Sequence, residues 1–213
     1  MKHPPGRQAT EDPSALIDSA AELGIDLIGN QADALLLFEL LLLDKAIPLG
    51  FVAEGDRTTI RERHILDSLR AVLALEGSDT NALDLGSGAG LPGIVVAIAR
   101  PSLRVGLVEA RGRRAAFLEL AVERLGLPNA VVLARPAGRL EGVVDICFAR
   151  ALAALSEAWN LARPRLRPGG RLVYFGGQGF REPEQMPADA SSFRLLRTPA
   201  LASSGPLVIM TLQ

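Results

Sequence analysis

A glycine-rich stretch at residues 81–93 constrains the fold of this chain more than any other feature of its sequence. It reads NALDLGSGAGLPG and is followed by the apolar run IVVAIA. The apolar residues before the glycines predict a short strand, and the run after them predicts a helix that packs on a sheet. Glycines in such a turn permit positive φ angles and let a ligand lie against bare backbone. The stretch therefore predicts a strand–turn–helix unit that binds a nucleotide-like ligand at the start of the helix.

Two classes of cofactor fit the glycine spacing. Gly88, Gly90 and Gly93 satisfy G-x-G-x-x-G, the dinucleotide fingerprint, which would make the chain an oxidoreductase that uses NAD. Asp84, two residues before Gly86, instead gives D-x-G-x-G-x-G, which resembles the first motif of S-adenosylmethionine methyltransferases. A carboxylate at this place disfavours a bound phosphate by charge repulsion. The sequence therefore favours S-adenosylmethionine, with the dinucleotide as the alternative.

A second acid supports a nucleotide site. The next predicted strand, residues 104–109, ends in Glu109, which lies 23 positions after Gly86. Such an acid accepts hydrogen bonds from both ribose hydroxyls in either class of cofactor. The plain structural alternatives are a solvated strand end for Asp84 and a helix cap for Glu109. Agreement among motif, spacing and strand context favours binding roles for both.

The rest of the chain alternates between strand and helix patterns and predicts an α/β fold. We expect a doubly wound, mostly parallel sheet of the Rossmann-like class I methyltransferase type, whose last two strands form a hairpin and whose ligand lies at the carboxyl ends of the strands. Residues 1–12 read as a disordered tail. Residues 13–78 read as a helical N-terminal cap, whose last helix begins at a capping box, Thr59-x-x-Glu62. Residues 79–213 are predicted to form the cofactor-binding domain, in one compact unit with the cap.

Composition places the protein in a broad class. With 213 residues and 48% hydrophobic content, one sizeable core is expected. The single cysteine, Cys147, excludes an internal disulfide, which fits a cytoplasmic location. Its apolar surroundings predict a buried thiol. The most apolar run, residues 34–43, is too short to cross a bilayer, so no membrane association is expected. We expect a monomer. Because the net charge is only -1, any RNA binding must depend on a local basic patch.

The chemistry must be one that needs few catalytic groups. The only histidines are His3 and His64, no Cys or His cluster has the spacing of metal ligands, and Ser87 has no partner base in the sequence. Methyl transfer needs neither a metal nor a triad, because the sulfonium of S-adenosylmethionine is already activated. The missing base indicates an acceptor that loses no proton, such as a ring nitrogen.

Several stretches resemble the RsmG (GidB) family, over about residues 35–175. They are RHILDSL at 63–69, LDLGSGAGLPGI at 83–94, RAAFL at 114–118, LGLPN at 125–129 and ARA at 149–151. Members of that family methylate guanine N7 in small-subunit ribosomal RNA. This atom is a bare lone pair in the major groove, which agrees with the missing base. The resemblance implies that ribosomal RNA, or a precursor of the small subunit, is the partner.

Motif and resemblance together give a set of candidate site residues. Pro136 and Ala137 are implied to lie at the adenine, and Arg150 at the methionine or acceptor side, with Arg135 as a second possibility. The cofactor-binding set is Asp84, Gly86, Ser87, Gly88, Gly90, Leu91, Glu109, Pro136, Ala137 and Arg150. The positioning residues near the reaction are Arg150, Arg135 and His64, and the candidates for RNA phosphates are Arg63, Arg113 and Arg114. No metal ligand is predicted.

The chain also departs from the family pattern. Residues 44–50, DKAIPLG, stand where the family has W-N-x-x-x-N-L-T, and Ala137 and Gly138 replace acidic residues. Gly176 and Gly177 replace a Lys-Gly pair whose lysine would face the acceptor. Two further alternatives therefore stand beside ribosomal RNA methylation: a diverged small-molecule methyltransferase, and a non-catalytic protein that binds S-adenosylmethionine.

Overall fold

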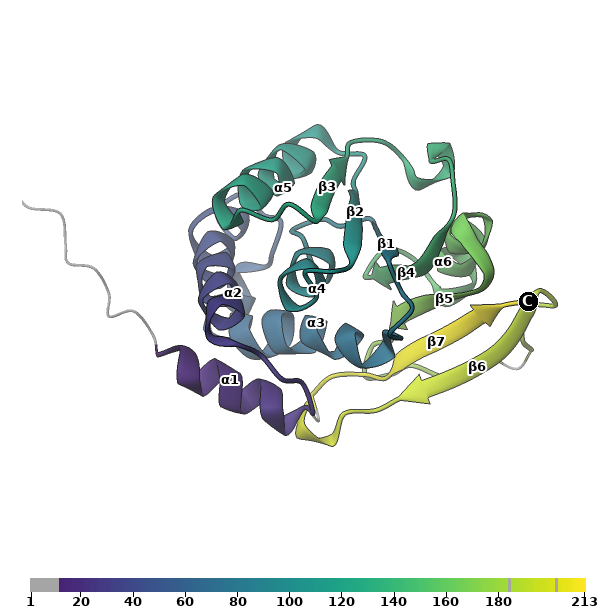
Figure 1. Cartoon of the computed structure of the whole chain (residues 1–213), viewed down its shortest axis with the longest axis horizontal. Coiled ribbons are helices and arrows are strands. Elements are labelled where there is room, and N and C mark those ends of the chain that lie inside the picture. The colour runs from purple at the N-terminus through teal and green to yellow at the C-terminus, as the bar shows by residue number, and fades with distance from the viewer. Residues whose placement is uncertain (1–11, 184, 202) are drawn as a thin grey trace, which may run out of the picture.

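The computed structural model describes residues 12–183, 185–201 and 203–213, and its centre is a seven-stranded sheet (Figure 1). The sheet order is β3-β2-β1-β4-β5-β7-β6. The first five strands run parallel, and β7 pairs antiparallel with both β5 and β6, so the predicted terminal hairpin is confirmed. The strands are β1 Asn81–Leu85, β2 Arg104–Val108, β3 Ala130–Leu133, β4 Val144–Arg150, β5 Leu166–Phe175, β6 Ala190–Leu196 and β7 Leu207–Leu212.

The order of the strands creates a switch point between β1 and β4. From β1 the chain moves outward to β2 and β3, and then returns to the other side of β1 as β4. The connecting loops diverge there, which opens a crevice at the carboxyl ends of the strands. The predicted doubly wound, mostly parallel sheet is confirmed, and it places the glycine turn after β1 at this crevice.

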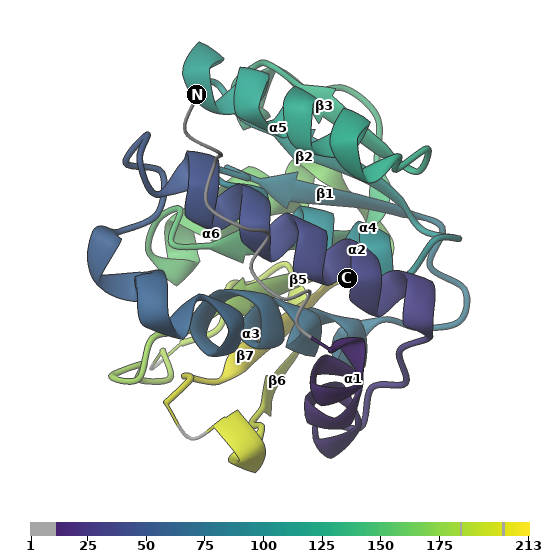
Figure 2. The same cartoon turned by 90° about the vertical axis from the view of Figure 1, so that its left-hand side faces the viewer.

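Helices cover both faces of the sheet. On one face lie α4 (Gly93–Ala99) and α5 (Gly112–Leu125), and on the other lies α6 (Leu155–Ala162). Every residue of α4 is buried, because α2 and α3 cross over it on the side away from the sheet (Figure 2). This explains why the run after the glycine turn is apolar on all sides instead of amphipathic.

The N-terminal helices pack on this first face. They are α1 (Pro13–Glu22) and α2 (Gly29–Leu41), which continues into a π-helical turn, Leu42–Ala46. A second helical segment then runs through a 3-10 turn at Glu54–Thr59, a π-helical turn at Arg61–Leu66, α3 (Asp67–Leu69) and a 3-10 turn at Arg70–Ala74. Their buried side chains belong to the same core cluster as those of α4. The domain boundary at residue 78 stays a prediction.

Some element boundaries differ from the sequence expectations. The helical segment predicted to begin at the Thr59 capping box starts at Glu54, and the Thr59 hydroxyl donates to the carbonyl of Asp56 at 3.4 Å. The capping prediction is wrong because Thr59 already lies inside the helical segment and its hydroxyl bonds back toward the preceding turn. The predicted disordered tail falls almost entirely outside the described residues. In the described part of the chain, no helix is long and apolar enough to cross a membrane.

Candidate functional site

The turn after β1 needs its glycines for backbone geometry. Gly86, Gly88 and Gly90 have φ angles of 72°, 57° and 88°, in the left-handed region that other residues rarely adopt. A Cβ on Gly90 would also lie only 2.5 Å from Cδ1 of Ile94. The turn therefore holds its shape through backbone conformations that side chains would disrupt, and it exposes main chain toward the crevice.

The same turn is packed closely against the loop that follows β4. A Cβ on Gly86 would lie 2.6 Å from Cδ1 of Leu152. Ala151, just before Leu152, has a φ of 49°, which is unusual for a residue with a side chain and is typical of strained backbone at functional sites. The loop after β4 and the glycine turn thus form one tightly fitted unit at the switch point.

The buried side chain of Asp84 holds the end of the glycine turn in place. It is 1% exposed, and its Oδ2 accepts a hydrogen bond from the backbone N–H of Gly93 at 3.0 Å. Burial raises the pKa of the Asp84 carboxyl to about 7. Among the residues that the structure describes, no donor reaches its Oδ1. The alternative of a solvated strand end is therefore wrong, and the unpartnered oxygen can accept from a ligand or a bound water.

Glu109 links β2 to the same turn. Its Oε2 accepts from the N–H of Gly88 at 3.1 Å, and its Oε1 accepts from the N–H of Arg111 at 2.8 Å. Arg111 is the N-cap residue of α5, so the helix-cap alternative describes part of the role of Glu109. Each carboxylate oxygen has a further lone pair, so the side chain can still accept from two ribose hydroxyls.

A cleft of about 740 Å³ opens beside the ends of β4 and β5. We call it the β4–β5 cleft. Its walls come from the RHILDS stretch, the strand ends and the loop before β7. The lining residues are Arg63, His64, Asp67, Arg150, Ala151, Tyr174, Phe175, Gly176, Gly177, Gln178, Ser203, Ser204 and Gly205. A cleft of this volume is in the range that holds a nucleotide or a small ligand.

Arg150 joins the RHILDS stretch to the end of β4. Its guanidinium donates to the carbonyl of Arg63 at 2.7 Å and pairs with Asp67 Oδ2 at 3.1 Å. It also lies over the ring of Phe175, 5.7 Å from the ring centroid. Burial lowers the pKa of Arg150, but a guanidinium remains charged at neutral pH. The structure therefore brings Arg150, Arg63 and His64 together in the β4–β5 cleft.

His64 is engaged on both sides of its ring. Its Nε2 lies 3.0 Å from Asp56 Oδ2, and its Nδ1 lies 3.4 Å from a guanidinium nitrogen of Arg150. Burial, followed by the charge of Arg150, lowers the pKa of His64. Asp56 also pairs with Arg63 at 2.8 Å. Sequence reasoning missed Asp56, because it precedes the predicted capping box at Thr59, where no periodicity or motif marks it.

The remaining phosphate candidates lie on α5, near the glycine turn. Arg113 is exposed in the first turn of the helix. Arg114 is half-buried: its guanidinium lies over the ring of Phe51, 5.7 Å from the centroid, and 3.9 Å from the point that a Cβ on Gly88 would occupy. Phe51 is a second residue that sequence reasoning missed. Arg114 therefore lies beside the glycine turn, whereas Arg113 faces solvent.

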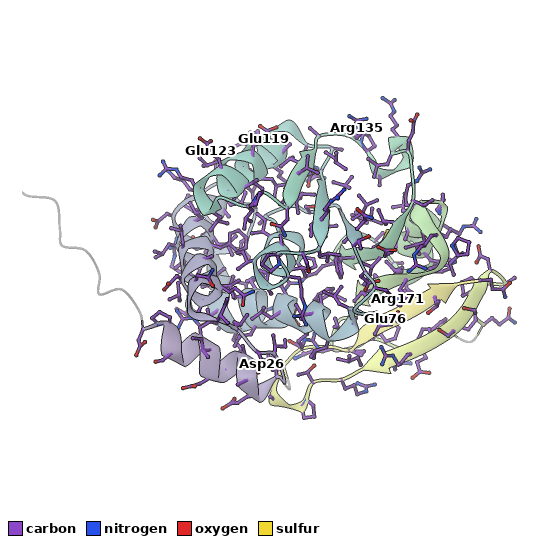
Figure 3. The ribbon with its side chains drawn as sticks, viewed as in Figure 1. Asp26, Glu76, Glu119, Glu123, Arg135 and Arg171 are labelled. Carbon is purple, nitrogen blue, oxygen red and sulfur yellow. The ribbon has the colours of Figure 1, made fainter. Side chains whose placement is uncertain are left out.

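The loop after β3 places its residues at the other side of the crevice. Arg135 and Pro136 are exposed and Ala137 is half-buried, and Arg135 lies at the outer edge of the fold (Figure 3). The sheet order puts β3 three strands from β4, or roughly 14 Å at the usual strand spacing. The structure thus does not bring Arg135 together with Arg150. Of the other cofactor candidates, Ser87 and Leu91 are buried, and the Ser87 hydroxyl donates to the carbonyl of Asp84 at 2.9 Å.

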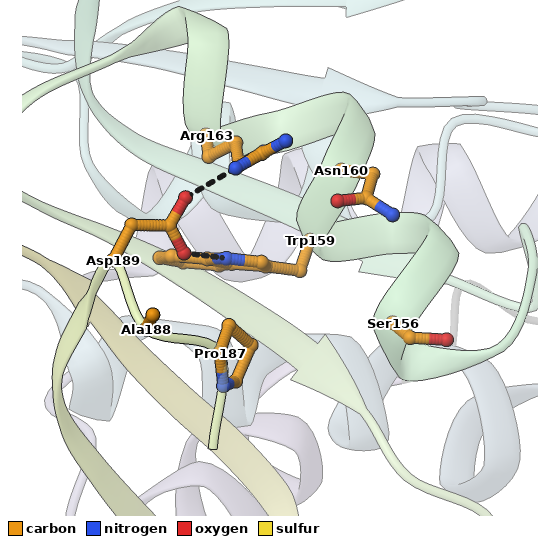
Figure 4. Close-up of a pocket in the computed structure, with 7 residues that line it drawn as sticks. All are labelled: Ser156, Trp159, Asn160, Arg163, Pro187, Ala188 and Asp189. Atoms are coloured by element: carbon orange, nitrogen blue, oxygen red, sulfur yellow. Dashed lines mark hydrogen bonds and ion pairs between the residues drawn. The ribbon is translucent and has the colours of Figure 1, made fainter. Parts of the chain in front are cut away.

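A separate pocket of about 360 Å³ lies beside α6, on the opposite face of the sheet (Figure 4). Trp159, which is 1% exposed, donates from Nε1 to Asp189 at 2.9 Å, and Arg163 pairs with the same carboxylate. The predicted burial of Cys147 is confirmed, and this burial raises the pKa of its thiol. Within the described ranges, no group of three or more His, Cys, Asp or Glu side chains has the arrangement of a metal site.

Comparison with known proteins gives the family. The sequence model of GidB, described as rRNA small subunit methyltransferase G, matches residues 31–199. The chain belongs to the GidB family. The ribosomal RNA small subunit methyltransferase G of Acidiphilium cryptum is 37% identical over 175 residues, which are 81% of this chain and 80% of the relative. The protein of that name from Leptothrix cholodnii is 33% identical over 207 residues, which are 93% of this chain and 95% of the relative.

Solved structures agree with this family in fold. A SAM dependent methyltransferase from Aquifex aeolicus has a TM-score of 0.57 at 16% identity, over 78% of this chain and 98% of the other. A methyltransferase from Geobacter sulfurreducens also has a TM-score of 0.57, at 15% identity, over 82% and 87%. The GidB chain therefore has the class I methyltransferase fold, and the methyltransferase frame of its glycine motif is preferred over the dinucleotide frame.

Proposed function

We propose that this GidB protein transfers a methyl group from S-adenosylmethionine to guanine N7 of small-subunit ribosomal RNA. The observation that carries the proposal is the position of Arg150. It ends β4 beside the glycine turn and binds the RHILDS stretch through Arg63 and Asp67. The cofactor turn and the second characteristic stretch of the sequence therefore meet at one crevice, and the names of the relatives supply the substrate class.

The residues along the crevice fit S-adenosylmethionine in the order of its parts. The adenine candidates follow β3, the ribose acid Glu109 follows β2, and the glycine turn follows β1, next to Arg150 on β4. Asp84 has an unpartnered oxygen that can accept a hydrogen bond from a donor of the ligand. Gly86 and Gly88 carry no side chains, so the ligand can lie directly against their backbone. When bound, the cofactor supplies an activated methyl group.

The β4–β5 cleft is where we place the acceptor. Arg150 presents donors there, and a single donor at guanine O6 would orient the base while leaving N7 open, whereas a bidentate contact to both atoms would block N7. Both ring nitrogens of His64 already have partners, which leaves that histidine poorly placed to act as a base. An acceptor that loses no proton, such as N7, agrees with this arrangement.

The loss of the family lysine gives weight to the small-molecule alternative. Gly176 and Gly177 line the β4–β5 cleft at that place. A Cβ on Gly176 would lie 3.0 Å from the carbonyl oxygen of Pro206, so even a short side chain there needs movement of the adjacent backbone. The cleft therefore offers the cations Arg63 and Arg150 and no lysine at this wall. The second candidate function is therefore methylation of an acceptor smaller than RNA. For both candidate functions we propose a monomeric enzyme that acts in the cytoplasm.

Mass spectrometry of nucleosides tests the proposal. Small-subunit ribosomal RNA from cells that contain the protein should hold 7-methylguanosine that is absent when the gene is deleted. Purified protein with S-adenosylmethionine should restore it on RNA from the deletion strain, offered both as naked RNA and as small subunits. Methylation of an exocyclic amine or a ribose hydroxyl would contradict the acceptor. Cofactor binding without any RNA methylation would favour the small-molecule or non-catalytic alternatives.

A further inference from the structure

Asp56 holds two consecutive side chains of the RHILDS stretch. Its Oδ1 lies 2.8 Å from a guanidinium nitrogen of Arg63, and its Oδ2 lies 3.0 Å from Nε2 of His64. Its own backbone is fixed in the 3-10 turn, where its N–H donates to the carbonyl of Ala53 at 3.0 Å. The Asp56 side chain is 16% exposed, so water screens these contacts only in part.

The contacts of His64 determine which of its nitrogens carries the proton. A guanidinium has donors and no acceptor, so the Nδ1 that faces Arg150 must present a lone pair. The proton of the neutral ring then lies on Nε2 and is donated to Asp56. The charged groups that face the ring are Asp56, Arg63 and Arg150, and burial with the Arg150 charge favours the neutral form.

Arg150 is thereby held by three groups of the RHILDS stretch. Asp67 pairs with its guanidinium at 3.1 Å, the Arg63 carbonyl accepts at 2.7 Å, and His64 Nδ1 lies at 3.4 Å. Asp67 is itself fixed by Arg70, which also donates to the carbonyl of Gly205 across the cleft at 3.0 Å. A long side chain loses rotamer freedom with each such contact, so its head is kept in one place before substrate binds.

We propose that Asp56 is a positioning residue of this site: its carboxylate orients the His64 ring and, through it, the Arg150 guanidinium that faces the acceptor. This inference rests on the proposed methyl transfer. Asp56 itself does not line the β4–β5 cleft, whereas Arg63, His64 and Arg150 do. Its loss should therefore slow the transfer step while leaving cofactor affinity unchanged, because the glycine turn is held by other groups, Asp84 and Glu109.

The test compares Asp56→Ala and Asp56→Asn with a matched control, Glu54→Gln. Glu54 lies in the same 3-10 turn and pairs with Arg57, and both side chains are exposed, at 71% and 44%. Single-turnover methylation of small-subunit RNA at saturating RNA and cofactor should fall about 10- to 100-fold in Asp56→Ala, the scale for a misplaced reacting geometry. Asp56→Asn keeps an oxygen that accepts from Nε2–H and should lose less. Glu54→Gln should keep the wild-type rate.

A spectroscopic measurement separates positioning from a loss of folding. The chain has two histidines, so nitrogen-15 NMR can resolve the tautomer of His64. The wild type should show the Nε2–H tautomer, and Asp56→Ala should show a mixture of tautomers. The affinities of the two proteins for S-adenosylhomocysteine should agree within about twofold. A wild-type rate or an unchanged tautomer in Asp56→Ala would overturn the inference, as would parallel losses of rate and cofactor affinity. A wild type that methylates no RNA would instead overturn the proposed function beneath it.

Discussion

Replacement of Asp84 by Asn should remove a pH dependence of stability that arises from the buried carboxyl. Burial raises the pKa of Asp84 to about 7 from the ordinary value of 3.8. Between these two values the folded protein retains a proton that the unfolded chain has already released. The free energy of unfolding therefore falls as the pH rises from about 4 to 7, and the loss is complete above the folded pKa.

The size of the effect follows from these two pKa values. At about 1.4 kcal/mol per pH unit, the full loss is about 4 kcal/mol, of which roughly 2.5 kcal/mol falls between pH 5 and pH 8. An Asn at this position keeps an oxygen that can accept from the Gly93 N–H and has no proton to release. The stability of Asp84→Asn relative to the wild type should therefore increase by about this amount from pH 5 to pH 8.

Urea denaturation of the ligand-free proteins at pH 5 and pH 8 measures this difference. All other ionisable groups are present in both proteins, so their titration largely cancels when the two free energies of unfolding are subtracted. A difference between Asp84→Asn and the wild type that is the same at both pH values would refute the reasoning, because it would show that Asp84 does not change its charge in this range.

Cofactor binding should depend on the same carboxyl. The sulfonium of S-adenosylmethionine is a cation, so its binding near the glycine turn favours ionised Asp84. We expect wild-type affinity for S-adenosylmethionine to rise from pH 6 to pH 8 more than affinity for S-adenosylhomocysteine, which lacks that charge. In Asp84→Asn the two ligands should share one pH dependence. Calorimetry in buffers of different ionisation enthalpy would count the protons released.

The other candidate residues give four further predictions. Gly86→Val should abolish binding of S-adenosylhomocysteine in calorimetry, because its φ of 72° and the 2.6 Å approach to Leu152 leave no place for a side chain; wild-type affinity would contradict this. Glu109→Ala should weaken S-adenosylmethionine binding by about 1 to 3 kcal/mol, the scale for unpaired hydroxyls, and an unchanged affinity would exclude a ribose role. Arg150→Ala should lower turnover by about 10²-fold or more. The rate of the wild type at saturating cofactor, measured as a function of pH, should stay nearly constant between about pH 6 and 9. Removal of Arg63 or Arg113 should make the slope of log RNA affinity against log salt concentration shallower by roughly one or less. Wild-type RNA binding that does not change with salt concentration would favour the small-molecule acceptor.

The local features of this protein could be read from its sequence. The strand, the glycine turn and the helix follow one another in one continuous stretch, from Asn81 to Ala99, and all three are present as predicted. The alternation of strand and helix patterns was sufficient for the doubly wound sheet, because parallel neighbours require crossover helices. The position of Glu109 at the end of β2 followed from the same regularity.

Only the tertiary structure decided how the groups at the crevice are combined. The sequence marks Asp84 as an acid near the cofactor, but its burial beneath the turn depends on the packing of α4, which also raises its pKa. The sequence offers both Arg150 and Arg135 as candidates, since each lies at or just past the end of a strand of the parallel sheet. The strand order alone separates them by three strands and places Arg150 beside His64.

Asp56 shows most clearly where sequence patterns end. It lies in a 3-10 turn that is followed by the π-helical turn of Arg63 and His64. Local propensity does not predict this succession, and the contacts of Asp56 with Arg63 and His64 depend on it. Its further connection to Arg150 spans about 90 positions of chain. Periodicity in the sequence determines which face of a helix or strand is buried. Contacts between residues so far apart depend instead on how whole helices and strands pack, and this packing decided how His64 and Arg150 are oriented.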